Sequence, residues 1–143
     1  MKIVCVGYRD WALEIYERLK VFYGNTHNII IVNKIQKEIY EKYKSIMLHP
    51  SDLPKFRGGT PIQNQIINGE TLSAVTIIEM TDELDGGDIL AQEEISLEGK
   101  IEDILKRITR VGSRLTKIII SGNIIRRKQN ENESTFYNSR KDQ

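Results

Sequence analysis

The stretch SIMLHPSDLPKFRGGTPIQ, residues 45–63, contains the signals that decide the fold. Its first four residues, Ser45 to Leu48, form a short apolar run that is typical of a buried strand. Prolines and glycines then punctuate the segment from His49 to Gly59, which favours a loop. Pro61 suits the first turn of a helix, where its missing N–H costs no hydrogen bond. The stretch therefore predicts a strand, a loop and a helix in succession.

The alternation of strands and helices continues on both sides of this stretch. Short β-branched runs predict further buried strands, and apolar residues at helical spacing predict helices, the longest of them near the C-terminus. The expected strands cover residues 2–6, 28–32, 73–79 and 88–94, and the expected further helices cover 11–22, 36–43 and 101–119. Strands that alternate with helices favour an α/β fold with a mainly parallel sheet.

Composition limits the classes of function. The 21 basic and 20 acidic residues leave a net charge of +1, so charge gives no reason to expect nucleic acid or a membrane surface as the main partner. No apolar run reaches the length of about 18 residues that a membrane span needs. The single cysteine, Cys5, excludes an internal disulfide, and the two distant histidines argue against a metal site. We therefore expect a reducing, cytoplasmic environment and no metal.

The length of 143 residues predicts one domain, which we place at residues 1–125. Residues 126–143 are polar, and only Phe136 and Tyr137 could anchor them to the rest of the protein. We expect this C-terminal tail to be mobile or half-docked.

Two loops carry the residues that are best suited to chemistry. His49 follows the strand that ends at Leu48, and Asp85 lies in the acidic loop after the strand that ends at Glu79. Ligands of open parallel sheets bind beyond the C-terminal ends of strands, so we expect both loops at that edge. A histidine near a carboxylate suits general acid–base catalysis. In the alternative interpretation His49 caps a strand and Asp85 merely shapes a turn.

Both loops also resemble a known family. Residues 49–63, HPSDLPKFRGGTPIQ, are similar to the HxSLLPxxRGxxPIQ segment of methionyl-tRNA formyltransferases. The loop from Thr81 to Asp88 resembles the acidic loop of the same superfamily, including glycinamide ribonucleotide formyltransferases. The resemblance covers roughly 34–137, and residues 1–23 resemble the first strand and helix of the family. It implies a Rossmann-like formyltransferase fold with a shortened, mainly parallel sheet and a long C-terminal helix.

The resemblance implies formyl transfer from 10-formyltetrahydrofolate to a primary amine, on methionyl-tRNA or on an amino sugar. The family uses an Asn-x-His pair and a distant aspartate. By position, His49 would stabilise the oxyanion of the tetrahedral intermediate, and Asp85 would keep the imidazole protonated and help to relay a proton. The resemblance further implies that Lys34, Ile35, Thr81, Asp82 and Glu83 bind the cofactor and that Ser51, Gly58, Gly59 and Gln63 bind the substrate.

The sequence departs from the family in two ways. Met47 stands where the family has its asparagine, and a thioether cannot donate a hydrogen bond. Either another donor substitutes, with Asn33 and Asn64 as candidates, or the enzyme is slow, or the chain is a catalytically impaired folate-binding or interaction module. The N-terminal half is also shorter than in the family, and the family's C-terminal tRNA-binding domain is expected to be missing. A shortened sheet exposes an edge, so we expect a homodimer or a partner there.

Overall fold

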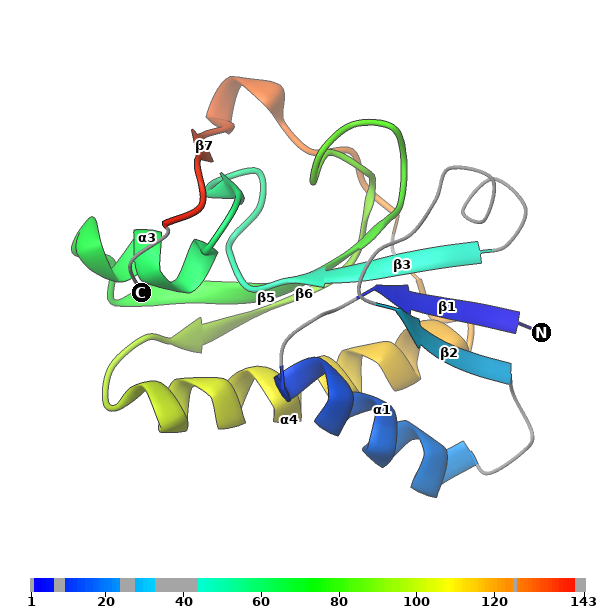
Figure 1. Ribbon diagram of the computed structural model, residues 1–143. Coiled ribbons are helices and arrows are strands. Elements are labelled where there is room, and N and C mark those ends of the chain that lie inside the picture. Colours follow the sequence, from blue (N-terminus) through cyan, green and yellow to red (C-terminus); the bar gives the residue numbers. More distant parts are fainter. Residues whose placement is uncertain (1, 7–9, 24–27, 33–43, 125, 141–143) are drawn as a thin grey trace.

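A five-stranded sheet forms the centre of the molecule (Figure 1). The computed structural model describes residues 2–6, 10–23, 28–32, 44–124 and 126–140. The strands of the sheet are β1 (Lys2–Val6), β2 (Asn28–Val32), β3 (Lys44–His49), β5 (Leu72–Glu79) and β6 (Ile89–Ser96). The helices are α1 (Asp10–Tyr23), α3 (Pro61–Ile67) and α4 (Ile101–Ile120). All of them lie within about two residues of the predicted bounds, and the helix expected at 36–43 lies outside the described residues.

The sheet has the order β2-β1-β3-β5-β6. Strand β1 pairs in parallel with both β2 and β3, whereas β5 pairs antiparallel with both β3 and β6. Four of the five strands therefore run in one direction, as predicted, and β5 runs against them. The loop after β3 and helix α3 lie beyond the end of β3 in Figure 1, so the chain re-enters the sheet from that end.

The main core lies between one face of the sheet and helices α1 and α4 (Figure 1). Alternate residues of the strands, among them Ile46, Val75 and Ile77, point toward α4. Ile108, which is fully buried on α4, meets them. Burying one such side chain contributes about 1.5–3 kcal/mol. Gly112 allows the close packing, because a Cβ there would lie 2.4 Å from Cδ1 of Leu48.

The opposite face of the sheet carries a smaller apolar cluster of Leu53, Ile78 and Ile89, with Met47 packed against it. The loop from Pro50 to Gly59 and the loop from Met80 to Asp88 lie over this face, and residues 126–140 run from the edge of β6, where Arg127 pairs with Ile89, to Arg57 and Gly58. We call residues 126–140 the C-terminal segment. This face, and not the helical one, holds the residues expected to carry chemistry.

The C-terminal segment is docked over its described length, which is more order than the expected mobile or half-docked tail. Strand β7 (Phe136–Tyr137) pairs in parallel with β4 (Arg57–Gly58), and a short 3-10 helix, η1 (Glu131–Glu133), precedes it. The rings of Phe56 and Tyr137 stack with their centroids 4.9 Å apart. These contacts join main chains far apart in sequence, and hydropathy does not encode them. No helix in the described part of the chain is long and apolar enough to cross a membrane.

Candidate active site

His49 and Asp85 meet over the sheet face that α1 and α4 leave free. His49 is the last residue of β3, and its imidazole Nδ1 lies 3.7 Å from Oδ2 of Asp85. Both side chains are buried, at 7% and 5% relative exposure. Sequence reasoning therefore selected two residues, 36 positions apart, that share one buried environment.

The route by which the two residues meet differs from the expected one. The two loops do not leave the same edge of the sheet, because β5 is antiparallel to β3 and Glu79, its last residue, pairs with Ile46. The loop that follows β5 lies over the sheet face and brings Asp85 to His49 (Figure 1). The candidate site therefore combines the C-terminal end of β3 with a loop that lies over the sheet face.

The second ring nitrogen of His49 is held by the main chain. Its Nε2 atom lies 2.8 Å from the carbonyl oxygen of Phe56. A carbonyl oxygen only accepts hydrogen bonds, so Nε2 carries a proton and donates it. The imidazole thus has a hydrogen-bond partner at Nε2, the carbonyl of Phe56, and a carboxylate oxygen of Asp85 within 3.7 Å of Nδ1.

Asp85 adopts an unusual backbone conformation and makes a second contact. Its φ angle is 52°, in the left-handed region that non-glycine residues seldom occupy. The Oδ2 atom that faces His49 also accepts a hydrogen bond of 2.8 Å from the N–H of Gly58. A buried carboxylate beside an imidazole interacts favourably with its cationic form and can accept a proton from it. The pair can therefore serve acid–base or oxyanion chemistry.

The structure places the expected substrate-binding residues in different settings. Gly58 contacts Asp85 directly, and Gly59 donates from its N–H to the carbonyl of Tyr137 at 3.1 Å. Ser51 is fully buried, and its hydroxyl donates to the carbonyl of Lys55, so it braces the loop and is closed to a ligand. Gln63 is partly buried on α3. Of the four, two contact the pair in the described part of the chain: Gly58 donates from its N–H to the Asp85 carboxylate, and Ser51 donates from its N–H to the main-chain carbonyl of His49 at 2.9 Å.

The missing asparagine has no replacement in the described site. Met47 packs against Leu53, Ile78 and Ile89 on the face that also carries His49. Asn64 is buried, and its side-chain amide donates to the carbonyls of Gly59 and Asn138 and accepts from Arg140, so it holds the C-terminal segment. The other candidate, Asn33, lies outside the described residues.

The expected cofactor-binding residues line a cavity next to Asp85. Thr81, Asp82 and Glu83 are exposed and line a cavity of about 500 Å³, together with Gly86 and Gly87. The C-terminal segment closes another side of this cavity with Lys128, Gln129 and Glu131. Lys34 and Ile35 lie outside the described residues.

Sequence reasoning missed the residues of the C-terminal segment that support the site. Gln129 is buried and hydrogen-bonded to both loops. Arg57 forms a two-pronged ion pair with Glu131, at 2.8 and 2.9 Å. This hydrogen-bonded pair raises the pKa of Arg57 and lowers the pKa of Glu131. The one indication of docking in the sequence is the aromatic pair Phe136 and Tyr137.

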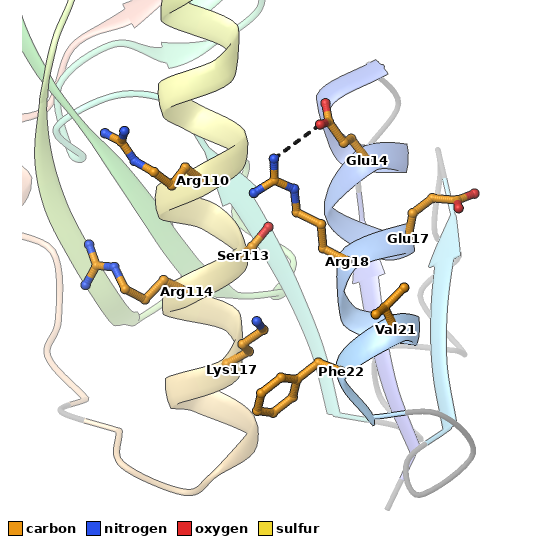
Figure 2. Close-up of a pocket in the computed structure, with 9 residues that line it drawn as sticks. All are labelled: Glu14, Glu17, Arg18, Val21, Phe22, Arg110, Ser113, Arg114 and Lys117. Atoms are coloured by element: carbon orange, nitrogen blue, oxygen red, sulfur yellow. Dashed lines mark hydrogen bonds and ion pairs between the residues drawn. The ribbon is translucent and has the colours of Figure 1, made fainter.

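A larger hollow on the helical side of the molecule is not the candidate site. It measures about 650 Å³ and lies between α1 and α4, as Figure 2 shows. Its lining is charged and surrounds the exposed ring of Phe22. Arg110 and Arg114 on α4 form one wall, and Arg18 on α1, which pairs with Glu14, forms the other. None of the residues singled out in the sequence lines it.

Comparisons with known proteins find similar sequences and structures. Residues 25–119, which include His49 and Asp85, match the family described as "Formyl transferase". The chain is 33% identical over 132 residues to the methionyl-tRNA formyltransferase of Rickettsia typhi, covering 78% of this chain and 44% of that protein. It is 41% identical over 102 residues to that of Ligilactobacillus salivarius, covering 66% of this chain and 32% of that protein. The chain thus spans less than half the length of these relatives.

Solved structures share the fold. The methionyl-tRNA formyltransferase from Clostridium thermocellum superposes with a TM-score of 0.85 at 23% identity, over 99% of this chain and 73% of that one. A sugar 3N-formyl transferase, WlaRD, solved with dTDP and 5-N-formyl-THF, gives a TM-score of 0.74 at 19% identity, over 96% of this chain and 69% of that one. HypX from Aquifex aeolicus in complex with tetrahydrofolic acid gives a TM-score of 0.77 at 19% identity, over 99% of this chain and 30% of that one. A fold of this kind therefore occurs in proteins solved with folates.

Proposed function

Because this chain belongs to the formyl transferase family, we propose that it transfers a formyl group from 10-formyltetrahydrofolate to a primary amine. The observation that supports this most is the buried contact between His49 and Asp85, at 3.7 Å, beside the N–H of Gly58. Both residues lie where the family's motifs occur in the sequence. A turn-shaping carboxylate would need no histidine beside it.

The reaction makes two demands on these residues. The amine nitrogen attacks the formyl carbon, so a C–N bond forms and negative charge develops on the formyl oxygen. The bond from that carbon to N10 of the folate then breaks, and the surplus proton of the amine must reach N10. An imidazolium at His49 stabilises the oxyanion, and the carboxylate of Asp85 stabilises the imidazolium and takes part in moving the proton.

The cavity beside Asp85 fits the proposed formyl donor. Its volume of about 500 Å³ lies within the usual range for small-molecule sites, about 300–1,000 Å³. Carboxylates at Asp82, Glu83 and Asp88 line it, and they can accept hydrogen bonds from the amino and N–H groups of a reduced pterin. We therefore assign Thr81, Asp82 and Glu83 to the donor, which supplies the activated one-carbon unit.

The acceptor is a primary amine of the methionyl-tRNA or amino-sugar type. The relatives from Rickettsia typhi and Ligilactobacillus salivarius are named for the first, and WlaRD for the second. We also propose that a second copy of the chain covers the outer edge of β2, an edge strand of the described sheet. Light scattering after size-exclusion chromatography tests this, and a stable monomer at micromolar concentration contradicts it.

A second candidate function is folate binding without catalysis. Two observations favour it: Met47 occupies the asparagine position inside an apolar cluster, and Nε2 of His49 is engaged with Phe56. In this state the imidazole has no N–H directed at a reactant. Losing one oxyanion donor typically costs about 10²–10³ in rate.

An assay of formyl transfer with both acceptor types tests the proposal. We expect turnover with at least one acceptor, and a loss of about 10²–10⁴ in rate in His49→Ala and in Asp85→Ala. Glu94→Ala, an exposed change on β6, is the matched control and should retain activity. Calorimetry with a stable folate analogue separates the alternatives. Binding without turnover supports the non-catalytic module, and failure to bind contradicts both candidate functions.

A further inference from the structure

Gln129 is a buried polar side chain that connects three parts of the candidate site. It is 8% exposed and belongs to the C-terminal segment. Its Nε2 atom donates to the carbonyl oxygens of Asp85 and Gly87, each at 2.8 Å. Both protons of the side-chain amide are therefore donated to the same loop, to the carbonyls of the two residues that flank Gly86.

Arg57 fixes the orientation of this amide. The Oε1 atom of Gln129 accepts hydrogen bonds from Nε and Nη2 of Arg57, at 3.2 and 3.0 Å. A guanidinium group can only donate, and the carbonyls of Asp85 and Gly87 can only accept. The amide oxygen must therefore face Arg57, and the amide nitrogen must face the loop. Glu131 in turn accepts a hydrogen bond from Arg57, so the contacts run from Glu131 through Arg57 and Gln129 to the Asp85 loop.

Asp85 needs such support more than an ordinary loop residue does. Its φ angle of 52° is in the left-handed region, where the side chain of an L-residue crowds its own backbone. Such conformations persist only where surrounding contacts determine them. One contact of Gln129 holds the carbonyl of Asp85, in the peptide plane that directly follows its Cα, and the other holds the carbonyl of Gly87, two residues further along the same loop.

We propose that Gln129 is a positioning residue, which acts through the backbone of the Asp85 loop to hold the Asp85 carboxylate against His49 and the N–H of Gly58. The inference rests on the proposed function for its catalytic consequence. Its structural part does not, because the carboxylate has a reporter: the N–H of Gly58 donates to Oδ2 of Asp85. Exchange of this amide hydrogen measures whether the carboxylate stays in place.

The test is Gln129→Glu in the full chain. This change keeps the shape of the side chain and its acceptor oxygens for Arg57, but it removes both donors and places oxygen against two carbonyls. We expect the Gly58 amide to exchange at least about tenfold faster, because a hydrogen bond to a charged group is lost. The Gly59 amide, which donates to the carbonyl of Tyr137, should keep its rate. In turnover, kcat should fall by a larger factor than KM changes, since Gln129 also lines the proposed donor cavity.

Gln92→Glu is the matched control. The amide of Gln92 also donates to a backbone carbonyl, that of Leu53, and accepts from an arginine, Arg127, on the same sheet face. In the described part of the chain its side-chain partners are Leu53, Thr76 and Arg127, none of which belongs to the Asp85 loop. We expect Gly58 exchange to be unchanged in this variant. Gln129→Met, which fills the same volume without polar atoms, should repeat the selective effect on Gly58.

Two outcomes overturn the inference. One is an unchanged Gly58 exchange rate in both Gln129 variants, and the other is an equal increase at Gly58 and Gly59, which indicates that the β4–β7 contact opens as a whole. A failure of the proposed function is detected by a different measurement, the turnover of the wild-type chain. If the wild-type chain shows no turnover, the selective loss at Gly58 still supports a positioning role for Gln129.

Discussion

The Nε2 atom of His49 lies 2.8 Å from the carbonyl oxygen of Phe56. Phe56 itself has a φ angle of 60°, so residues with left-handed backbone flank the imidazole on both sides, Phe56 at Nε2 and Asp85 at Nδ1. Strained backbone of this kind is concentrated at functional sites. For His49 to act on an oxyanion through Nε2, the bond to Phe56 must open when the donor binds.

This geometry predicts a protected ring N–H in the free protein. Exposed imidazole protons exchange rapidly with water, but Nε2–H of His49 is buried and hydrogen-bonded. We expect one slowly exchanging imidazole signal in the proton–nitrogen spectrum at neutral pH, and the chain has only two histidines to assign. The signal should vanish in His49→Gln. A ring proton found on Nδ1 alone would contradict the assignment of the proton to Nε2.

The position of Met47 gives a second prediction. Met47→Asn restores the side chain that the family has two residues before its histidine. We expect the transfer rate to rise, by up to about 10²–10³ if this donor alone is limiting. The protein should lose about 1–3 kcal/mol of stability, because an amide then lies against Leu53, Ile78 and Ile89 without a partner.

Met47→Leu is the control for this change. It keeps an apolar side chain of similar volume, so we expect an unchanged rate and a loss of less than about 1.5 kcal/mol. Rates from an assay of formyl transfer and midpoints of urea unfolding provide the comparison. A folded Met47→Asn protein without any gain in rate means that another group already supplies the hydrogen bond.

The sequence predicted the elements of the fold better than their connections. Strands such as β3 and the long helix α4 follow from apolar periodicity, which reports burial directly. Periodicity does not report strand direction, so the antiparallel course of β5 could not be read from it. His49 and Asp85 were identified from their loops, whereas the left-handed backbone of Asp85 depends on tertiary contacts.

The C-terminal segment shows a further limit of sequence reasoning. Its polar composition predicts a mobile or half-docked tail, but it is docked over its described length through backbone hydrogen bonds such as Arg57 N–H to Thr135 O, at 2.9 Å. Every residue type supplies these groups, so composition carries no signal for them. The role of Gln129 could not be predicted either, because a glutamine in a polar segment is ordinarily solvated.

The contact between Gly58 and the C-terminal segment gives a third prediction. A Cβ at Gly58 would lie 2.1 Å from the carbonyl oxygen of Tyr137, and the residue has a φ angle of 101°. Gly58→Ala should therefore separate β4 from β7 and cost about 3 kcal/mol or more. Gly69 has a similar φ of 82° with nothing within 4 Å, so Gly69→Ala should cost only the backbone strain, about 1–2 kcal/mol.

Denaturant unfolding and limited proteolysis of the C-terminal segment measure this difference. We expect faster cleavage within residues 126–140 in Gly58→Ala and an unchanged rate in Gly69→Ala. Equal losses of stability in the two variants would show that strain at φ, and not the contact with Tyr137, decides the cost.

The ion pair of Arg57 and Glu131 predicts how docking of the C-terminal segment depends on pH. The hydrogen bonds from Arg57 lower the pKa of Glu131 relative to an unfolded chain. A depressed carboxyl pKa contributes stability that is complete above the unfolded value, about 4.3, and is lost as pH falls through the folded value. We therefore expect Glu131→Gln to lower Tm at pH 7, and the difference from wild type to shrink below about pH 4.

Glu133→Gln is the matched control, since Glu133 lies in the same 3-10 helix and its recorded side-chain contact is to the amide of Asn130. Its Tm should follow that of wild type across the titration. High salt should reduce the Glu131 effect only partly, because the Arg57 side chain is 12% exposed and the pair is bidentate. A Tm difference for Glu131→Gln that is as large at pH 3 as at pH 7 would mean that shape, and not charge, holds Glu131 against Arg57. In that case the order of Arg57, and with it the orientation of the Gln129 amide, does not depend on the carboxylate.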